Sequence, residues 1–229
     1  MARKDDPMVH TPHLDLAYER ELHAISNLVS TMADAAQAMV GDAVRALLTH
    51  DLELGSQIAG RDEHLDGLET RCDDACIQLM ARRAPVGRDL RFVTGVLKLV
   101  ADLERIGDLA VNVVKRDREI EKLRPLPTEV VDLANSVIAE LALALTALKT
   151  RDATLARRLR SEDHATDARN RAAFDRLLQV CEDSGKFNEV LAVTNVCRHL
   201  ERIGDHAVNV AEMVVYMVEG KVMRHNPDV

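Results

Sequence analysis

Aromatic residues are nearly absent from this sequence. Its 229 residues include no tryptophan, two tyrosines and three phenylalanines. Because β-sheets draw on aromatic side chains, a composition carried by Ala, Leu, Val and charged residues favours long helices. The same scarcity leaves little to stack against single-stranded bases, and a net charge of −8 repels a phosphate backbone. We therefore expect no nucleic acid among the partners.

Long apolar runs are missing as well. No stretch of 18 apolar residues occurs, so we expect no membrane span, and the first twenty residues lack the apolar segment of a signal peptide. A cytoplasmic location follows as the expectation. The four cysteines show no zinc-finger spacing, and in that compartment we expect them to be reduced and mostly buried. They are Cys72, Cys76, Cys181 and Cys197.

Prolines are few, and long stretches of the chain contain none. Since proline breaks helix interiors, these stretches are open to long helices. Asp51 and Asp152 are suitable N-caps, and Ser184-Gly185 suits a helix end and turn. The sequence predicts six helices, at about 13–49, 52–83, 88–122, 128–150, 153–183 and 187–219.

The chain contains an internal repeat. Residues 103–113 read LERIGDLAVNV and residues 200–210 read LERIGDHAVNV, so they differ only at Leu109 and His206. Such a match indicates a tandem duplication. Apolar residues recur at spacings of three and four through each copy, which predicts a buried helix face. The two stripes are Val96, Leu99, Leu103, Ile106, Ala110, Val113 and Val193, Val196, Leu200, Ile203, Ala207, Val210.

The repeat extends upstream, where the segments from Asp51 and Asp152 share their spacing of aspartates. The offset between copies falls from 101 to 97 along the chain, which predicts a shorter connection before the last helix. We predict an all-α fold of two tandem three-helix bundles with antiparallel neighbours. The predicted units are 13–123 and 124–219, with flexible termini at 1–12 and 220–229.

Each unit carries two pairs of acidic residues spaced four apart, one pair on its second helix and one on its third. The pairs are Asp62/Asp66 and Glu104/Asp108 in the first unit, and Asp163/Asp167 and Glu201/Asp205 in the second. Residues four apart share a helix face, so two facing pairs would gather four carboxylates in one groove. A cation such as Mg, Mn, Ca or Fe would relieve their repulsion.

The sequence thus predicts one cation site in each unit, with Asn112 and Asn209 as outer-shell partners. The alternative is a solvated acidic face whose charges pair with Arg105 and Arg202. The Glu-x-x-His pattern of di-iron bundles is missing, because glycine stands three residues after Glu104 and after Glu201.

Those glycines, Gly107 and Gly204, need a reason of their own. Glycine inside a helix costs about 1 kcal/mol relative to alanine. Close approach of a neighbouring helix, or of an ion and its waters, would supply that reason. The histidines near the acids are expected in surface or outer-shell roles; they are His64, His164, His199 and His206.

The duplicated L-E-R-I-G-D-x-A-V-N motif, together with the Arg83-to-Arg91 segment RAPVGRDLR, resembles the PhoU family. The resemblance implies a cytoplasmic, non-catalytic regulator that restrains phosphate uptake and the phosphate-starvation response. It implies two protein partners, the ATPase subunit of the phosphate ABC transporter and a membrane sensor histidine kinase, and a homodimer. It also implies iron or zinc clusters on the acidic pairs, where the carboxylate chemistry would equally admit Mn or Mg.

Four arginines surround the loop before the third helix, in an otherwise acidic protein. We expect Arg82, Arg83, Arg88 and Arg91 to form a partner surface beside the metal groove. Solvated ion pairs are the alternative. For the whole chain, the competing functions are a metal-dependent phosphohydrolase and a plain helical scaffold. The enzyme is disfavoured because no Gly-rich phosphate loop and no nucleophile beside a base is present, and we assign no catalytic residue.

Overall fold

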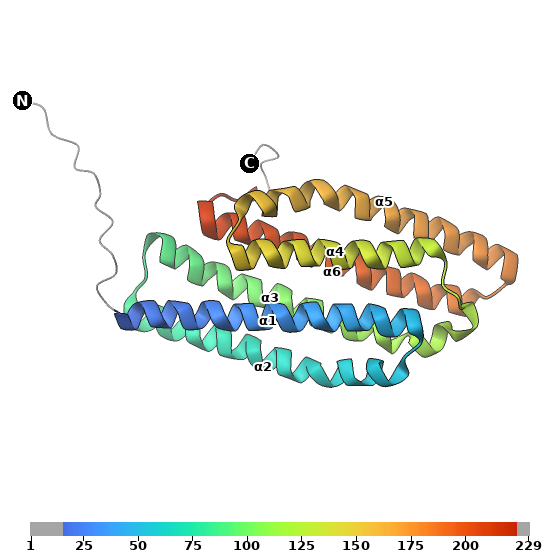
Figure 1. The fold of residues 1–229 in the computed structure, drawn as a ribbon, viewed down its shortest axis with the longest axis horizontal. Coiled ribbons are helices and arrows are strands. Elements are labelled where there is room, and N and C mark those ends of the chain that lie inside the picture. The colour runs from blue at the N-terminus through green and yellow to red at the C-terminus, as the bar shows by residue number, and fades with distance from the viewer. Residues whose placement is uncertain (1–15, 224–229) are drawn as a thin grey trace, which may run out of the picture.

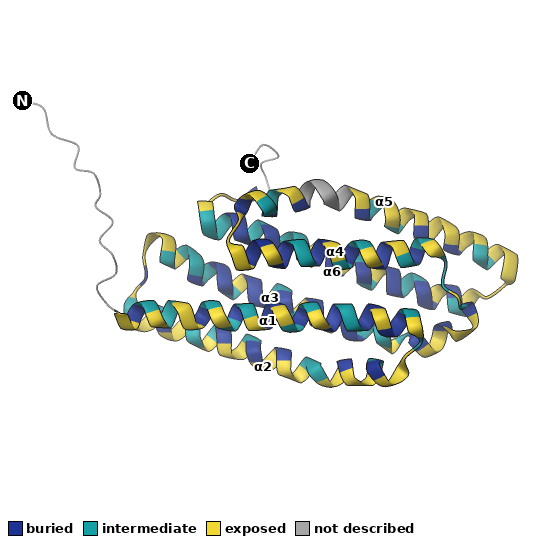
Figure 2. Ribbon diagram, viewed as in Figure 1, coloured by how far each residue is buried: buried dark blue, intermediate teal, exposed yellow. Residues whose placement is uncertain are grey.

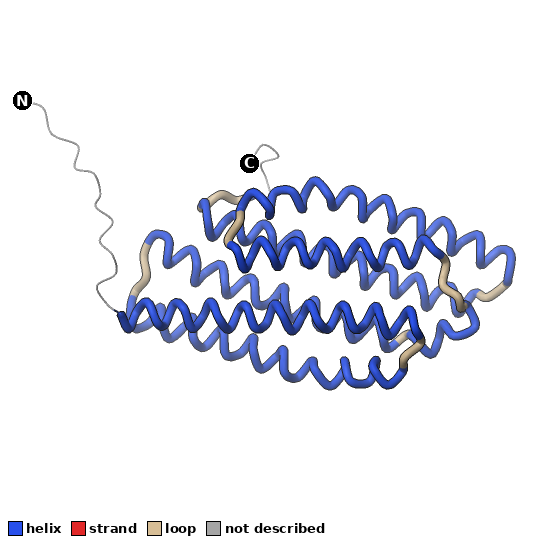
Figure 3. Tube along the Cα trace, viewed as in Figure 1, coloured by secondary structure: helices blue, strands red, loops and turns tan. Residues whose placement is uncertain are grey.

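The computed structural model describes residues 16–223, apart from the side chains of residues 160–164. Within that range the chain is helical, without strands, as predicted (Figures 1 and 3). The helices are α1 (Leu16–Thr49), α2 (Leu52–Arg83), α3 (Gly87–Lys115), the 3-10 helix η1 (Asp117–Leu123), α4 (Thr128–Thr150), α5 (Ala153–Ser184) and α6 (Phe187–Glu219).

Local signals placed most helix ends correctly. The Asp51 side chain accepts a hydrogen bond from the Leu54 amide at 2.9 Å. Asp152 accepts from the amides of Thr154 and Leu155 at 2.8 and 2.9 Å. Gly185 ends α5 in the left-handed conformation, at a φ of 66°. These caps satisfy backbone groups that a helix end leaves open.

The third helix is shorter than predicted. It ends at Lys115, and residues 117–123 form the tighter η1 instead of completing a helix to 122. The cause is a buried carboxylate, because Asp117 is only 3% exposed and holds two partners. His50 Nδ1 donates to it at 2.8 Å, and Arg124 forms an ion pair with it. These contacts anchor the link between the two units.

The termini were predicted to be flexible at 1–12 and from residue 220 onward. Residues 1–12 and 224–229 lie outside the described residues. In the described part of the C-terminal segment, residues 220–222 are exposed and Met223 is buried at 2% exposure, and flexibility stays a prediction. Gly220 caps α6 with a φ of 74° and precedes that buried contact.

Both predicted apolar stripes are buried, on α3 and on α6. The two helices lie against each other along the middle of the molecule, and α1 also contacts α4 across the same boundary. Figure 2 shows the buried residues on the faces that the helices turn toward one another. The two three-helix units therefore share one continuous core. All four cysteines are free thiols; Cys72, Cys76 and Cys197 are buried.

The connection before α6 is shorter than its counterpart before α3, as the change in offset predicted. Three residues separate α2 from α3, and two separate α5 from α6. Relative to the repeat, α3 also begins three residues earlier than α6. The additional segment contains Gly87 and Arg88, so only the first unit has the extended arginine-rich tip.

Within the described residues, α4 is long and apolar enough to cross a membrane by length and composition. Counting uninterrupted apolar runs had missed this candidate. In the structure α4 packs against α5, α6 and α1, and it carries the buried Glu140. These contacts are typical of the core helix of a bundle.

The glycines of the repeated motif allow close packing between helices. An alanine Cβ at Gly107 would lie 2.3 Å from Leu65 Cδ2, a contact that requires movement of a fully buried side chain. At Gly204 the added Cβ would lie 3.2 Å from Glu140 Oε2 and 4.0 Å from Thr166 Cγ2. Helix approach, one of the two explanations considered, thus accounts for both glycines.

We predict that Gly107→Ala destabilises the protein by about 1–2 kcal/mol, because the new methyl group overpacks the contact with Leu65. Gly67→Ala on α2 is the matched control. Its added Cβ meets nothing within 4 Å, so the substitution should stabilise the helix by up to about 1 kcal/mol. Urea unfolding measures both. Equal stability of the two variants would contradict the close approach.

Candidate metal centre

The predicted acids of the first unit come together where α2 and α3 run side by side. Asp62 and Asp66 lie on α2, and Glu104 and Asp108 lie on α3. Burial raises the pKa of Asp62, and the carboxylates of Asp108 and Asp66 raise it further. Repulsion thus acts both along α2 and between the helices, which is the arrangement that the sequence predicted.

The Glu104 side chain is 18% exposed, compared with 38% for Asp108. Burial, followed by repulsion from Asp108, raises its pKa to about 7; Glu69 and Asp66 add to the rise and Arg105 opposes it. Without a cation this carboxyl group therefore holds a proton near neutral pH. A cation that replaces the proton would recover the full ligand charge.

Arg105 spans the α3 acids. Its Nε lies 3.4 Å from Glu104 Oε2, and its Nη1 donates to Asp108 Oδ2 at 3.0 Å. The side chain is 58% exposed, so these ion pairs are weak and exchangeable. The alternative of arginine-paired acids therefore describes part of what is found. Metal binding would displace Arg105 toward solvent.

Two further acids, Glu69 and Asp73, extend the α2 row. Burial raises the pKa of Glu69, with further contributions from Asp73 and Asp66. Asp73 Oδ1 is buried and has no hydrogen-bond partner among the described residues. Sequence reasoning missed this pair, although the signal was present, because 62, 66, 69 and 73 follow the 4-3-4 spacing of one helix face.

We call Asp62, Asp66, Glu69, Glu104 and Asp108 the first acidic cluster. Among the described side chains, no three His, Cys, Asp or Glu groups converge closely enough to form a ready metal site. The donor chemistry nevertheless fits a cation, because the cluster offers only oxygen ligands under mutual repulsion and the neighbouring Asp73 oxygen is unpaired. Binding would require carboxylate rotation and release of Arg105.

The second unit has a weaker version of this arrangement. Desolvation raises the pKa of Asp205 and Asp167 adds to the rise, while His206 and Arg202 lower it. The side chain of Asp163 lies outside the described residues. The positions equivalent to Glu69 and Asp73 are Asn170 and Phe174, so two acids are missing.

Glu201 lines a surface pocket of about 310 Å³ between α5 and α6. Asn170 and Phe174 lie in the same pocket, together with Arg171 and Arg198. Asp175 is a further acid in this pocket, but an amide and an aromatic ring stand where the first unit has Glu69 and Asp73. The two units offer unequal environments to a metal ion.

The two asparagines lie at the α3–α6 boundary between the units. Asn209 Nδ2 donates to Asp102 Oδ1 at 3.1 Å, and His206 Nδ1 lies 2.8 Å from the same oxygen. Asn112 lines a cavity with His199 of α6. Their contacts thus join the units, and an outer-shell role toward a metal stays a prediction.

The four arginines near the α2–α3 tip divide into two kinds. Arg82 and Arg88 are exposed, whereas Arg83 bonds Glu21 of α1 at 3.1 Å. Arg91 packs near Gly220 at the end of α6, and its Nε is buried without a hydrogen-bond partner in the described part of the chain. Thirteen residues of α3 separate Arg91 from Glu104, about 20 Å of helix. The four arginines therefore do not share one exposed surface, and Arg91 lies far along α3 from Glu104. A partner contact of these arginines stays a prediction.

The fold and these paired acids define a class of duplicated helical proteins, and comparison with known proteins identifies it. Residues 29–117 and 130–214 each match the PhoU domain. The chain belongs to the PhoU family.

Relatives align over nearly the whole chain. The phosphate-specific transport system accessory protein PhoU homolog of Pseudomonas putida is 34% identical over 219 residues, covering 94% of this chain and 86% of that protein. The PhoU protein of Escherichia coli (strain K12) is 31% identical, covering 93% and 90%.

Solved structures of the family have the same fold. The crystal structure of PhoU from Pseudomonas aeruginosa matches with a TM-score of 0.84 at 33% identity, covering 89% of this chain and 100% of that one. PhoU from Streptococcus pneumoniae, described as a phosphate transport system regulatory protein, matches with a TM-score of 0.83 at 22% identity. It covers 90% of this chain and 98% of its own, and it supports the fold alone.

We predict that Glu104→Gln stabilises the metal-free protein at pH 8 by roughly 0.5–1 kcal/mol, since it removes a carboxylate repelled by its neighbours. Because the pKa of Glu104 is raised in the folded state, proton binding by Glu104 stabilises the folded parent at low pH. This contribution is lost as pH rises through about 7. The gain from the substitution should therefore vanish at pH 4.

Thermal unfolding in chelator at both pH values provides the measurement. Glu63→Gln, at an exposed acid on α2, is the matched control and should change stability little at either pH. A Glu104→Gln variant that is no more stable than the parent at pH 8 would show that the acids do not strain the folded state.

Proposed function

We propose that this chain is an accessory protein of a phosphate-specific transport system. The observation that carries the proposal is the alignment with relatives of that name, which extends over about nine-tenths of this chain and most of theirs. The same helices and the same duplicated motif are therefore available for the same kind of task. The relatives' description as accessory proteins supports a role beside the transporter.

The proposal has a finer part, which concerns regulation. The chain acts in the cytoplasm as a non-catalytic homodimer that restrains phosphate uptake and the phosphate-starvation response. It does so by contacting the ATPase subunit of the phosphate transporter and a membrane sensor histidine kinase. Arg82 and Arg88 are candidate contacts, because both cations are exposed at the tip that only the first unit possesses.

The acidic pairs hold metal ions in this proposal, as iron or zinc clusters or as Mn or Mg. The first site uses Asp62, Asp66, Glu104 and Asp108, with Glu69 and Asp73 in reach; the second uses Asp163, Asp167, Glu201 and Asp205. Two observations support the first site, the repulsion that raises the pKa of Glu104 and the unpaired Asp73 oxygen. A bound cation would neutralise this surface and lock α2 to α3.

Deleting the gene in its own organism should raise phosphate uptake in phosphate-replete cells, because the restraint on the transporter is removed. The parent protein should restore low uptake, and the Arg82→Glu/Arg88→Glu variant should fail to do so. Arg118→Glu, which reverses an exposed charge on η1, is the matched control and should restore it. Uptake of radiolabelled phosphate gives the readout. Unchanged or lower uptake after deletion would contradict the regulatory role.

Metal titration tests the acidic sites. With free Mn, Fe or Zn at about 100 times the Kd of the first site, that site should add about 2.7 kcal/mol to the stability of the parent, or roughly 5–10 °C in Tm, and the second site should add less. Glu104→Gln/Asp108→Asn should lose the larger part of the total shift, because the first site has Glu69 and Asp73 beside its four acids. Glu201→Gln/Asp205→Asn should lose the smaller part.

Elemental analysis of protein purified without chelator gives the stoichiometry that accompanies those shifts. If both double variants keep the parent's metal content and Tm shift, the acids are a solvated face and the metal proposal fails. Phosphatase activity that appears with Mn or Fe, and disappears in the same variants, would instead favour the metal-dependent hydrolase over the adaptor.

A further inference from the structure

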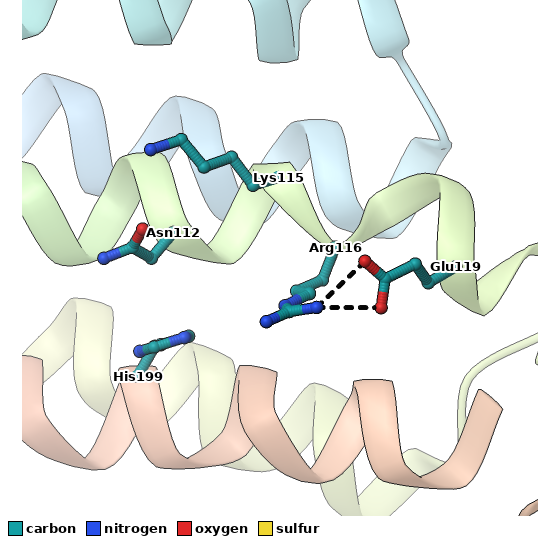
Figure 4. Close-up of a pocket in the computed structure, with 5 residues that line it drawn as sticks. All are labelled: Asn112, Lys115, Arg116, Glu119 and His199. Atoms are coloured by element: carbon teal, nitrogen blue, oxygen red, sulfur yellow. Dashed lines mark hydrogen bonds and ion pairs between the residues drawn. The ribbon is translucent and has the colours of Figure 1, made fainter. Parts of the chain in front are cut away.

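A small cavity lies between the two units. The end of α3 and the start of η1 form one wall, and His199 of α6 lies on the other (Figure 4). It has a volume of about 290 Å³, at the lower end of the range for ligand pockets. Its lining consists of Asn112, Lys115, Arg116, Glu119 and His199.

The lining is rich in hydrogen-bond donors with positive charge. Arg116 uses a single nitrogen, Nη1, for both of its bonds to Glu119, at 2.9 and 3.0 Å. The remaining nitrogens of its guanidinium, like the amide of Asn112, bond no other described residue. Figure 4 shows the Arg116 side chain extending from α3 toward α6, on the side of His199. The Lys115 side chain runs along the other side of α3 (Figure 4), where it lowers the pKa of Asp62. A guanidinium fork beside an amide suits an oxyanion.

His199 completes the donor set. Its Nδ1 is buried and has no hydrogen-bond partner among the described residues. An imidazole nitrogen without a partner can donate an N–H to a ligand, and the guanidinium of Arg116 lines the same cavity.

The internal repeat supplies an independent indication of what this cavity takes. By the offset of 97, Asn112 corresponds to Asn209 and His199 corresponds to Asp102. At that related place the Asp102 carboxylate accepts from Asn209 at 3.1 Å and contacts His206 at 2.8 Å. One side of the boundary thus contains an oxyanion that belongs to the protein itself.

On the cavity side, that carboxylate is replaced by histidine and the nearby charges are reversed. Lys115 and Arg116 stand where the other copy has Glu212 and Met213. Asn209 thus donates to the Asp102 carboxylate, whereas the equivalent Asn112 lines a cavity beside Arg116. An anion from solution would restore the missing partner.

We propose that this cavity binds a free tetrahedral oxyanion of the phosphate class. Arg116 and Asn112 donate hydrogen bonds to its oxygens, His199 donates a further one, and the guanidinium of Arg116 supplies the positive charge. The choice of phosphate among such anions rests on the proposed function, whereas the anion chemistry rests on the cavity. Glu119 competes with the anion for Arg116, so it sets the affinity.

Isothermal titration of the full chain with inorganic phosphate, at constant ionic strength in chelator, tests this site. The parent should bind about one phosphate per chain. Arg116→Gln/Glu119→Gln, which removes the ion pair as a unit, should weaken binding by roughly tenfold or more. Glu119→Gln alone should strengthen it several-fold, because it frees the guanidinium and removes a negative charge. Arg118→Gln, a neighbouring exposed arginine outside the lining, should bind like the parent.

Sulfate and AMP are the comparison ligands. Phosphate binding that exceeds both supports a site for the free ion. The inference is overturned if sulfate binds as tightly as phosphate or if AMP binds more tightly. It is also overturned if the Kd for phosphate is not below about 10 mM, the order expected for a surface anion site. So would an unchanged affinity in both Glu119→Gln and the double variant. Absence of phosphate binding in a protein that still controls uptake would refute this site and leave the proposed function standing.

Discussion

The α3 and α6 helices carry the same motif, and their contact with each other organises the molecule. Each places an apolar stripe of the LERIGD repeat in the shared core, where all twelve stripe residues are buried. Every other α-helix of the described chain packs against one of these two. Since the apolar faces are used between the units, the acids on α3 and α6 are left along the edges where α2 and α5 approach. The same contact creates the polar cavity between the units.

Charge repulsion limits what those edges tolerate without a cation. In the first unit a carboxyl group with a pKa near 7 and an exposed arginine partly relieve the crowding. Neither the proton on Glu104 nor the ion pairs of Arg105 are held tightly, because the proton leaves as pH rises and an exposed ion pair costs little to break. The carboxylates of the first acidic cluster can therefore change partners at little cost.

The duplicated units differ at corresponding positions, both within each unit and at the boundary between the units. Gly107 packs between Leu65 and Met39, whereas the equivalent Gly204 lies beside Glu140 and Thr166. One unit is therefore apolar at this layer and the other is polar. At the unit boundary, Asp102 on one side corresponds to His199 on the other. Duplication gave two copies of one scaffold, and these substitutions give each copy a different chemistry.

The sequence by itself determined the helices, the duplication and the acidic pairs, because each depends on neighbours within a few residues. Caps such as Asp51, the 3.6-residue periodicity and the four-residue spacing are local. Tertiary structure alone decided that η1 interrupts the third helix, where Asp117 meets His50. It also joined Glu69 to the acids of α3 and Asn209 to Asp102. Periodicity shows which face of a helix is apolar, but it does not show which distant helix packs on that face. The packing of helix on helix decides where the remaining polar groups meet.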